Sequence, residues 1–416
     1  MPILTRTVVV PSVPLTEKKL KIFKEFQEIY SEILLELVEF GFKKGIKSFT
    51  GLKKQKYREL RQRHSNLPSH YIYTACQDAS TRIKSFLKLK KKGIARTEKP
   101  EVKKVSIWLD DHLWKMVDRT TIKIATHKGW IFVPLVPHKL YWKYINTGWK
   151  MKSQPKIRLD EKSRRLLVYF VFEREVKVQQ NLQAVISVDI NESNVTVKVG
   201  RKVFILLSDI KRLTLGYASY REAMQSFRGN KYVKKTVKDN ERNRKKDRRM
   251  KLANIIAETA KQLNAVVAVE NLPKRCPENM IRDVKNSKLR HRIYQAGFRS
   301  LIKAIEEKCL ERGILVVKVN PKGTSSVCPI CGYEPMRGYA PRLLLCPRCN
   351  LKIGRDVVAV MNIEKRAFQT LKGSVPLGPM PYESAPEVAV LPMKEWMRRK
   401  SLPPTLNDFI CIGMKR

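Results

Sequence analysis

The stretch AVISVDINESNVTVKV, residues 184–199, decides the fold of the second half of this chain. Its first six residues form an apolar run that ends in Asp189, which is typical of a strand buried on both faces of a sheet. Residues 195–199 and 203–207 are β-prone and close enough in sequence to continue as a meander. The sequence therefore predicts three neighbouring strands, the first of which ends in an acid.

The segments that follow alternate between helical and strand patterns. Residues 266–270 (VVAVE) repeat the design of an apolar strand with an acid, Glu270, at its end. Helical patterns at about 209–264 and 287–312, a strand at 314–319 and a last helix at 354–370 complete the region. The order strand, meander, helix, strand, helix, strand, helix is the layout of an RNase-H-like α/β domain.

Three carboxylates occupy corresponding places in this layout. Asp189 and Glu270 end strands, and Asp356 opens the last helix. Any one acid in such a place is more often a cap or a solvated strand end. Together they can converge on two divalent cations, Mg²⁺ or Mn²⁺, about 3.5–4 Å apart, which is the arrangement for phosphodiester cleavage. The sequence predicts all three as catalytic metal ligands, and the single histidine within 184–370 makes a histidine-based site a poor alternative.

Two Cys-x-x-Cys pairs precede Asp356, namely Cys328 with Cys331 and Cys346 with Cys349. Two thiolates separated by two residues can face one cation, and two such pairs complete a closed tetrahedral Zn²⁺ site. Four reduced thiols are the alternative, which the proline inside each pair disfavours. A closed site has no open position for a substrate, so the predicted zinc is structural. The other four cysteines are scattered, and this usage indicates a reducing, cytoplasmic compartment.

The charge of the chain points to a polyanionic partner. The 416 residues include 85 Lys and Arg against 38 Asp and Glu, a net charge of +47, which favours nucleic acid. No apolar run approaches 18 residues, so a membrane is the weaker alternative. Residues 231–251 are the densest basic segment and are predicted to follow phosphates along a helix. The nucleic-acid-binding residues predicted there are Lys234, Lys235, Lys238, Arg242, Arg244, Lys245, Lys246, Arg248 and Arg249.

The first half of the chain has a different pattern. Five of the six tryptophans lie in its β-prone part, where their rings either stack on bases or pack in a core: Trp108, Trp114, Trp130, Trp142 and Trp149.

The predicted boundaries are 1–14 and 103–176 for a β-rich domain, 15–102 for a helical insert, 177–183 for a linker, 184–321 and 353–373 for the nuclease domain, 322–352 for the zinc ribbon, and 374–416 for a disordered tail.

Five segments together resemble the motifs of the TnpB (OrfB) family, the accessory transposases of insertion sequences, which are similar to the nuclease half of type V CRISPR effectors. They are VDINESNVTV (188–197), VENL (269–272), TSSVCPICG (324–332), CPRC (346–349) and GRDVVAVMNI (354–363). The first half agrees with the family in layout only. Three positions depart from the common pattern: Asn191 for Gly, Val358 for Asn and Val360 for Ala.

The resemblance implies an RNA-guided DNA endonuclease of transposon origin. Its fold would be a β-rich wedge domain with a helical recognition insert, followed by a RuvC-like domain that carries the zinc ribbon. Asp189, Glu270 and Asp356 would be the acids of the first, second and third motifs. The partners would be a guide RNA from the protein's own element and target DNA, in a monomeric ribonucleoprotein of the cytoplasm, associated with the nucleoid of a prokaryote.

Two other functions remain open at this point. An RNA-guided DNA-binding regulator would bind its target without cutting it, and such a protein is expected to lose a carboxylate. A conventional transposase would join DNA strands without any RNA. The retained acids disfavour the first, and a zinc ribbon between the second and third acids disfavours the other.

Overall fold

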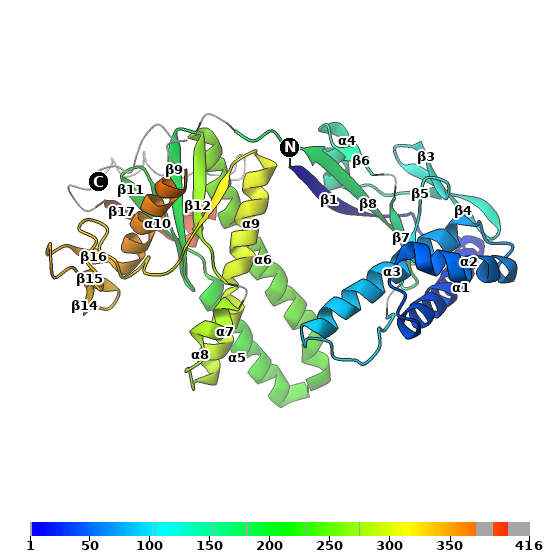
Figure 1. The fold of residues 1–416 in the computed structure, drawn as a ribbon, viewed down its shortest axis with the longest axis horizontal. Coiled ribbons are helices and arrows are strands. Elements are labelled where there is room, and N and C mark those ends of the chain that lie inside the picture. The colour runs from blue at the N-terminus through cyan, green and yellow to red at the C-terminus, as the bar shows by residue number, and fades with distance from the viewer. Residues whose placement is uncertain are drawn as a thin grey trace. The chain divides into compact units, whose positions relative to one another are not determined.

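The computed structural model describes residues 2–103, 105–152, 154–179, 182–228, 230–273, 275–371 and 386–397. The chain divides into two compact units, Ile3–Glu175 and the region from Val176 onward, which also includes the first two residues. Both units contain strands and helices (Figure 1), so the predicted mixed α/β character is confirmed. No helix among the described residues is both long and apolar enough to span a membrane.

A five-stranded antiparallel sheet forms the centre of the N-terminal unit. β1 (Ile3–Pro11) pairs along its whole length with β8 (Arg165–Glu175), and this pairing joins the start of the chain to residues far along it. Alternate residues of β8 are buried, as expected for a strand with one face on a core. The other strands of the sheet are β2 (Ile107–Trp108), β6 (Lys150–Met151) and β7 (Lys156–Asp160).

A second, three-stranded sheet and a short helix complete the β-rich part. The sheet consists of β3 (Trp114–Asp118), β4 (Thr121–Thr126) and β5 (Gly129–Pro134). The helix is α4 (Lys139–Asn146), which buries Tyr141 and Tyr144. Sequence interpretation placed only strands here, because α4 is too short for its periodicity to stand out.

Three helices lie between β1 and β2 in the sequence: α1 (Glu17–Lys43), α2 (Phe49–Arg63) and α3 (His70–Lys91). Thr16 and Ser48 cap α1 and α2, since each hydroxyl accepts a hydrogen bond from a backbone N–H three residues later. Most of the apolar face of α1 is buried in the core that these helices share with the sheets.

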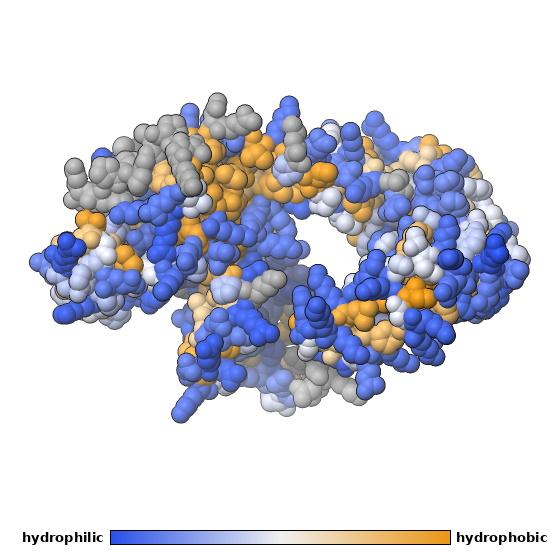
Figure 2. Space-filling model, in the orientation of Figure 1, coloured by the Kyte–Doolittle hydropathy of each residue, from blue (hydrophilic) through white to orange (hydrophobic). Residues whose placement is uncertain are grey.

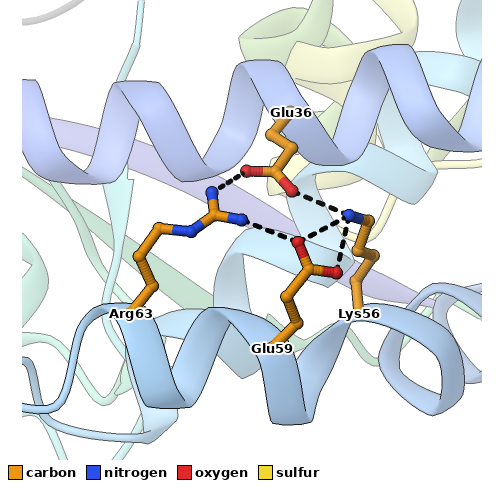
Figure 3. Close-up of polar contacts among 4 residues, drawn as sticks. All are labelled: Glu36, Lys56, Glu59 and Arg63. Carbon is orange, nitrogen blue, oxygen red and sulfur yellow. Dashed lines mark hydrogen bonds and ion pairs between the residues drawn. The ribbon is translucent and has the colours of Figure 1, made fainter.

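A network of charges links α1 to α2 (Figure 3). Glu36 of α1 accepts hydrogen bonds from Lys56 at 2.9 Å and from Arg63 at 2.5 Å, and both cations also bind Glu59 of α2. Partial burial opposes ionisation of Glu36, but the two cations outweigh it and hold the pKa of this carboxyl below its usual value. A network of this kind fixes the spacing of the two helices.

The C-terminal unit contains a six-stranded mixed sheet in the order β13-β12-β9-β10-β11-β17. β9 (Ala184–Ile190), β10 (Asn194–Val199) and β11 (Lys202–Leu207) form the antiparallel meander. β12 (Ala265–Glu270) lies parallel to both β9 and β13 (Val316–Val319). Parallel pairing brings the carboxyl ends of β9 and β12 to the same edge of the sheet.

Helices cover both faces of this sheet (Figure 1). Ile186 and Val267 pack with α6 (Asn230–Gln262) and α9 (Phe298–Glu311), whereas their neighbours Val185 and Val266 pack with α10 (Arg355–Leu371). Successive residues of a strand point to opposite faces, so a strand covered on both sides must be apolar throughout. The remaining helices of the region are α5 (Ile210–Arg228), α7 (Cys276–Met280) and α8 (Ser287–Ala296).

The prediction of a disordered tail over 374–416 is wrong for residues 386–397. β17 (Glu387–Leu391) pairs in parallel with β11, and α11 (Met393–Met397) follows it. The Trp396 side chain is buried and its Nε1 donates to the Leu207 carbonyl at 3.2 Å. Surrounding prolines hid this short β-prone run, while the open edge of β11 offers it hydrogen-bond partners. Residues 372–385 and 398–416 lie outside the described residues.

Candidate functional site

The three acids singled out in the sequence lie in one pocket. Asp189 lies near the carboxyl end of β9, Glu270 is the last residue of β12, and Asp356 is in the first turn of α10. All three line a cavity of about 460 Å³. The sheet brings the two strand ends together, and α10 packs against both strands, so the convergence follows directly from the fold.

Neutral side chains hold one oxygen of each carboxylate. The Asn191 amide donates to Oδ2 of Asp189 at 2.7 Å, and the Thr324 hydroxyl donates to Oε1 of Glu270 at 2.5 Å. The Asn194 amide donates to Oδ2 of Asp356 at 3.3 Å. In the sequence Asn191 stands out only as a departure from the family pattern, and the other two donors are recognisable only from their contacts.

The electrostatics of this pocket favour a bound cation. Burial, and then the negative charges of Glu270 and Asp356, raise the pKa of Asp189 to about 7. Burial also raises the pKa of Glu270, against the opposing effects of the Thr324 hydroxyl and Arg366. Like charges that cannot ionise freely are typical of functional sites. Divalent cations such as Mg²⁺ prefer carboxylate oxygens, so this donor set fits the predicted Mg²⁺ or Mn²⁺.

One cation of the protein already contacts the pocket. Arg342 lies in the turn between β14 (Arg337–Ala340) and β15 (Leu343–Leu345), where it has a φ of 64°. Its guanidinium donates to Oδ1 of Asp356 at 2.5 Å, and more than half of its side chain is exposed. Arg342 is not among the predicted site residues, because nothing in the sequence indicates that this hairpin folds back onto α10.

The four predicted zinc ligands form one cluster. The sulfur atoms of Cys328, Cys331, Cys346 and Cys349 all lie within 4.8 Å of one another. The sulfur–sulfur distance is 3.6 Å between Cys328 and Cys349, and 3.4 Å between Cys331 and Cys346. A tetrahedral ion with Zn–S bonds of about 2.3 Å sets neighbouring sulfurs about 3.8 Å apart. The cluster therefore has the composition and the size of a structural zinc site.

Each cysteine pair forms a similar tight turn. The residue after the second cysteine, Gly332 or Asn350, has a positive φ, and its N–H donates to the carbonyl of the first cysteine. Burial opposes ionisation of Cys346, but the backbone N–H groups of Cys349 and Arg348 outweigh it and lower the pKa of this thiol to about 7. In the equivalent turn burial raises the pKa of the Cys328 thiol, against the opposing effect of the N–H groups of Cys331 and Ile330. In both turns the backbone N–H groups favour the thiolate form, which is the form that binds a metal.

Asn362 connects the cysteine cluster to the carboxylate pocket. This residue of α10 is buried, and its amide donates to the backbone carbonyls of Thr324 at 2.9 Å and Val327 at 2.8 Å. Thr324 in turn donates to Glu270. The segment that enters the first cysteine turn is thereby fastened to the helix that carries Asp356, so the ribbon and the pocket share their supports.

The predicted phosphate-binding helix is α6, and only part of its basic set faces solvent. Arg242, Arg244 and Lys246 are exposed, and Arg248 is half-buried beside Asp247. Figure 2 shows that hydrophilic residues cover most of the visible face of both units. The side chains of Lys234, Lys235 and Lys238 lie outside the described residues. The role of the exposed residues stays a prediction.

Lys245 and Arg249, also predicted to bind nucleic acid, instead make contacts within the protein. Lys245 is buried, binds Glu241 one turn earlier, and donates to Gln295 of α8 at 3.1 Å. Arg249 donates to the last carbonyls of α8, those of Gln295 and Ala296. Both side chains therefore contact the C-terminal end of α8. A charge run cannot show which of its positions a neighbouring helix will cover.

The tryptophans divide between packing and exposure. Trp114 is buried in the core, and Trp142 and Trp149 are partly buried against it. Trp108 is half-buried with the Lys156 ammonium 3.6 Å from its ring centroid. Trp130 on β5 is 44% exposed, and its ring lies near the Lys123 ammonium, so it is the one best placed for stacking on a base.

Two family patterns match separate parts of the chain. Residues 26–125 match the uncharacterized protein MJ0013 family, and residues 298–363 match the Cas12f1-like TNB domain. The second range contains both cysteine pairs and Asp356.

Individual relatives match between about a quarter and a little over half of the chain. An uncharacterized protein of Methanocaldococcus jannaschii, MJ0857, is 35% identical over 54% of this chain and 90% of its own length. The TnpB-like protein MJ0751 of the same organism is 31% identical over 47% of this chain and 73% of its own length. The CRISPR-associated endodeoxyribonuclease Cas12f2 of a Micrarchaeota archaeon is 32% identical over 28% of this chain and 23% of its own length.

A solved structure resembles the fold across most of the chain. It is a complex of Cas12f1 with single guide RNA and target DNA, and it aligns with a TM-score of 0.53 and 16% identity over 84% of this chain and 83% of the other. At this identity the likeness concerns the fold alone.

Proposed function

Because this chain belongs to the TnpB-like family, related to type V CRISPR effectors, we propose that it is an RNA-guided DNA endonuclease of transposon origin. The observation that carries the proposal is the pocket in which Asp189, Glu270 and Asp356 converge. A protein that only bound nucleic acid would have no use for three converging acids, of which Asp189 has its pKa raised by burial and by the charges of the other two. Such acids destabilise the fold unless a cation or a proton compensates them.

The sheet of the C-terminal unit supports a RuvC-like, RNase-H-like assignment. A three-stranded meander, a parallel strand on its first member and a helix that carries the third acid are the elements that this assignment requires. The acids lie at the ends of β9 and β12 and at the start of α10. This agreement in order and place is what supports the assignment.

The residues of the pocket have separate roles in the proposed reaction. Asp189, Glu270 and Asp356 would hold two divalent cations, which supply activation of a water molecule and stabilisation of the leaving oxygen. Asn191 and Thr324 fix one oxygen of Asp189 and of Glu270 and so orient the second oxygen of each acid. Asn194 and Arg342 donate to the two oxygens of Asp356. Arg342 and Arg355 line the same pocket and would bind the phosphate of the DNA strand.

The rest of the chain would bind the nucleic acids. The net charge of +47 and the exposed basic residues of α6 suit the backbone of a structured RNA. Cas12f1, whose fold this chain shares, was solved with guide RNA and target DNA. Sequence choice would come from base pairing between guide and target, while the N-terminal unit reads a short flanking motif. We propose a monomeric ribonucleoprotein in the prokaryotic cytoplasm, associated with the nucleoid.

The test begins with the ribonucleoprotein purified from its native cell. One abundant RNA that maps to the flank of the protein's own gene is expected, and it should direct Mg²⁺-dependent cleavage of matching DNA. Asp189→Ala should abolish the cut and retain RNA binding. Random RNA of all sizes would contradict guidance. Target binding without a cut would identify a regulator, and strand joining without RNA would identify a conventional transposase.

A further inference from the structure

A second candidate metal cluster lies in the N-terminal unit. His70 is the first residue of α3, and Asp110 and His112 lie in the loop between β2 and β3. One possible ligand atom from each residue lies within 4.8 Å of the others. The two imidazole rings are stacked, with centroids 4.0 Å apart and an interplanar angle of 24°. Two separate segments of the chain therefore place three ligand-type side chains together.

The carboxylate of Asp110 is the buried centre of this cluster. Its side chain is only 6% exposed, and within the described part of the chain its ion-pair partners are the two histidines. Oδ2 lies 2.6 Å from Nδ1 of His70, and Oδ1 accepts the backbone N–H of His112 at 3.1 Å. Asp111 lies at the rim, with Oδ1 3.2 Å from Nδ1 of His112. A desolvated carboxylate of this kind needs a positive partner.

A simple hydrogen bond that fastens α3 to the loop is the alternative explanation. It accounts for His70, whose Nδ1 is within bonding distance of Asp110. It does not account for the position of His112, whose 63% exposed side chain stacks on His70 and faces Asp110 as well as the exposed Asp111. Two imidazole rings and a buried carboxylate within reach of one point are the donor set of a transition metal.

We propose that His70, Asp110 and His112 bind a divalent first-row transition metal ion, with Zn²⁺ as the ion that fits best. Ligand atoms around a tetrahedral zinc lie about 3.3 Å apart. The 2.6 Å contact between His70 and Asp110 would therefore lengthen, and the 3.9 Å separation of His112 from Asp110 would shorten. The exposed His112 can make that movement, because its side chain is not held in a core. Water or Asp111 would complete the coordination. Imidazole nitrogen is a poor ligand for Mg²⁺, so this site differs in metal preference from the carboxylate pocket.

The ion would act as a clamp within the N-terminal unit. It would connect the start of α3 to the loop before β3 (Trp114–Asp118), and it would compensate the buried charge of Asp110. Binding to the folded state alone raises stability as the ligand concentration exceeds its dissociation constant. The site requires neither a guide RNA nor nuclease activity, so its test does not depend on the function proposed above.

The first experiment counts zinc. The full chain is purified without a histidine tag, equilibrated with Zn²⁺, dialysed against metal-free buffer and analysed for zinc per chain. Two equivalents are expected for the wild type, and one for His70→Gln combined with His112→Asn. His138→Gln, at an exposed histidine of the same unit, is the matched control and should retain two. One equivalent in the wild type, or two in the double variant, would overturn the proposal.

A cobalt titration covers the case in which the double variant misfolds. Thiolate ligands give Co²⁺ a strong charge-transfer absorption, whereas nitrogen and oxygen ligands give only weak d–d bands. The first equivalent should show the thiolate signal of the ribbon, and the second should add d–d bands alone. In the exposed single variant His112→Asn the second component should weaken by more than the roughly 10–100-fold typical of losing an outer-shell partner. If the second Co²⁺ component is unchanged in His112→Asn, the cluster is no metal site and His70 and Asp110 form only a hydrogen bond.

Discussion

The cysteine cluster and the carboxylate pocket are supported by the same helix, α10, but they are built in opposite ways. The four sulfurs come from residues 328–349, and each pair is shaped by its own tight turn. The three acids come from two strands and a helix that lie far apart in the sequence. The first site is therefore local and closed, and the second is a tertiary site open to solvent. Removal of a ligand should have opposite consequences for stability in the two.

The largest effect is expected for the cysteine cluster. Zinc binding in small structural sites is worth on the order of 10–16 kcal/mol and is inseparable from folding. Cys346→Ser should therefore unfold the ribbon, expose the start of α10 and abolish cleavage. Hydrogen exchange should show lost protection over residues 322–362, with the sheet still protected. A ribbon that remains protected without zinc would contradict the structural role.

The opposite sign is expected for Asp189→Asn. Its folded-state pKa of about 7 exceeds the unfolded value, so the folded wild type binds the extra proton and loses stability as the pH rises from about 4 to 7. In buffer without Mg²⁺ or Mn²⁺, the variant should melt higher than the wild type at pH 8 and nearly equally at pH 4. The difference should be a few kcal/mol, on the scale of about 1.4 kcal/mol per pKa unit.

Two controls sharpen this prediction. Asp283→Asn, at an exposed aspartate of the same unit, should leave the melting temperature nearly unchanged at both pH values. Added Mg²⁺ should stabilise the wild type and not Asp189→Asn. If Asp189→Asn is less stable than the wild type at pH 8 without metal, the charge of Asp189 is well compensated in the wild-type protein.

Arg342 connects the two sites, and an intermediate effect is expected for it. Arg342→Ala should lower cleavage by about 10–100-fold, as expected for a lost charge-assisted contact of about 1.5–3 kcal/mol, while zinc content stays at the wild-type level. Arg337→Ala, at an exposed arginine of the same hairpin, is the matched control. Equal losses for both variants would point to a general disturbance of the hairpin rather than a contact with the pocket.

The smallest effects are expected on α6, where exposed and buried cations differ. Alanine at Arg242, Arg244 or Lys246 should each weaken RNA binding a few-fold and reduce its salt dependence, by about one counterion per contact. Lys245→Ala should leave the salt dependence unchanged and lower stability, because it strips Glu241 of a buried partner. Binding curves at several salt concentrations, together with thermal melts, separate the two classes.

Much of this architecture is predictable from local signals. Uninterrupted apolar runs predict β9 and β12 as strands buried on both faces, and the spacing of the cysteines predicts the ribbon. Both patterns depend on near neighbours in the sequence. The acids at the strand ends were recognisable as candidates for the same reason. The role of the short run at β17 was missed, since only the open edge of β11 turns five residues into a strand.

The sequence by itself determined the strand pattern, the four-cysteine cluster and the positive charge of this protein. The tertiary structure alone decided which side of α6 is buried, that Arg342 reaches Asp356, and that His70 meets Asp110 and His112. The physical reason is range. Periodicity and ligand spacing act within a few residues, whereas burial and ion pairing depend on which distant segments the core brings together.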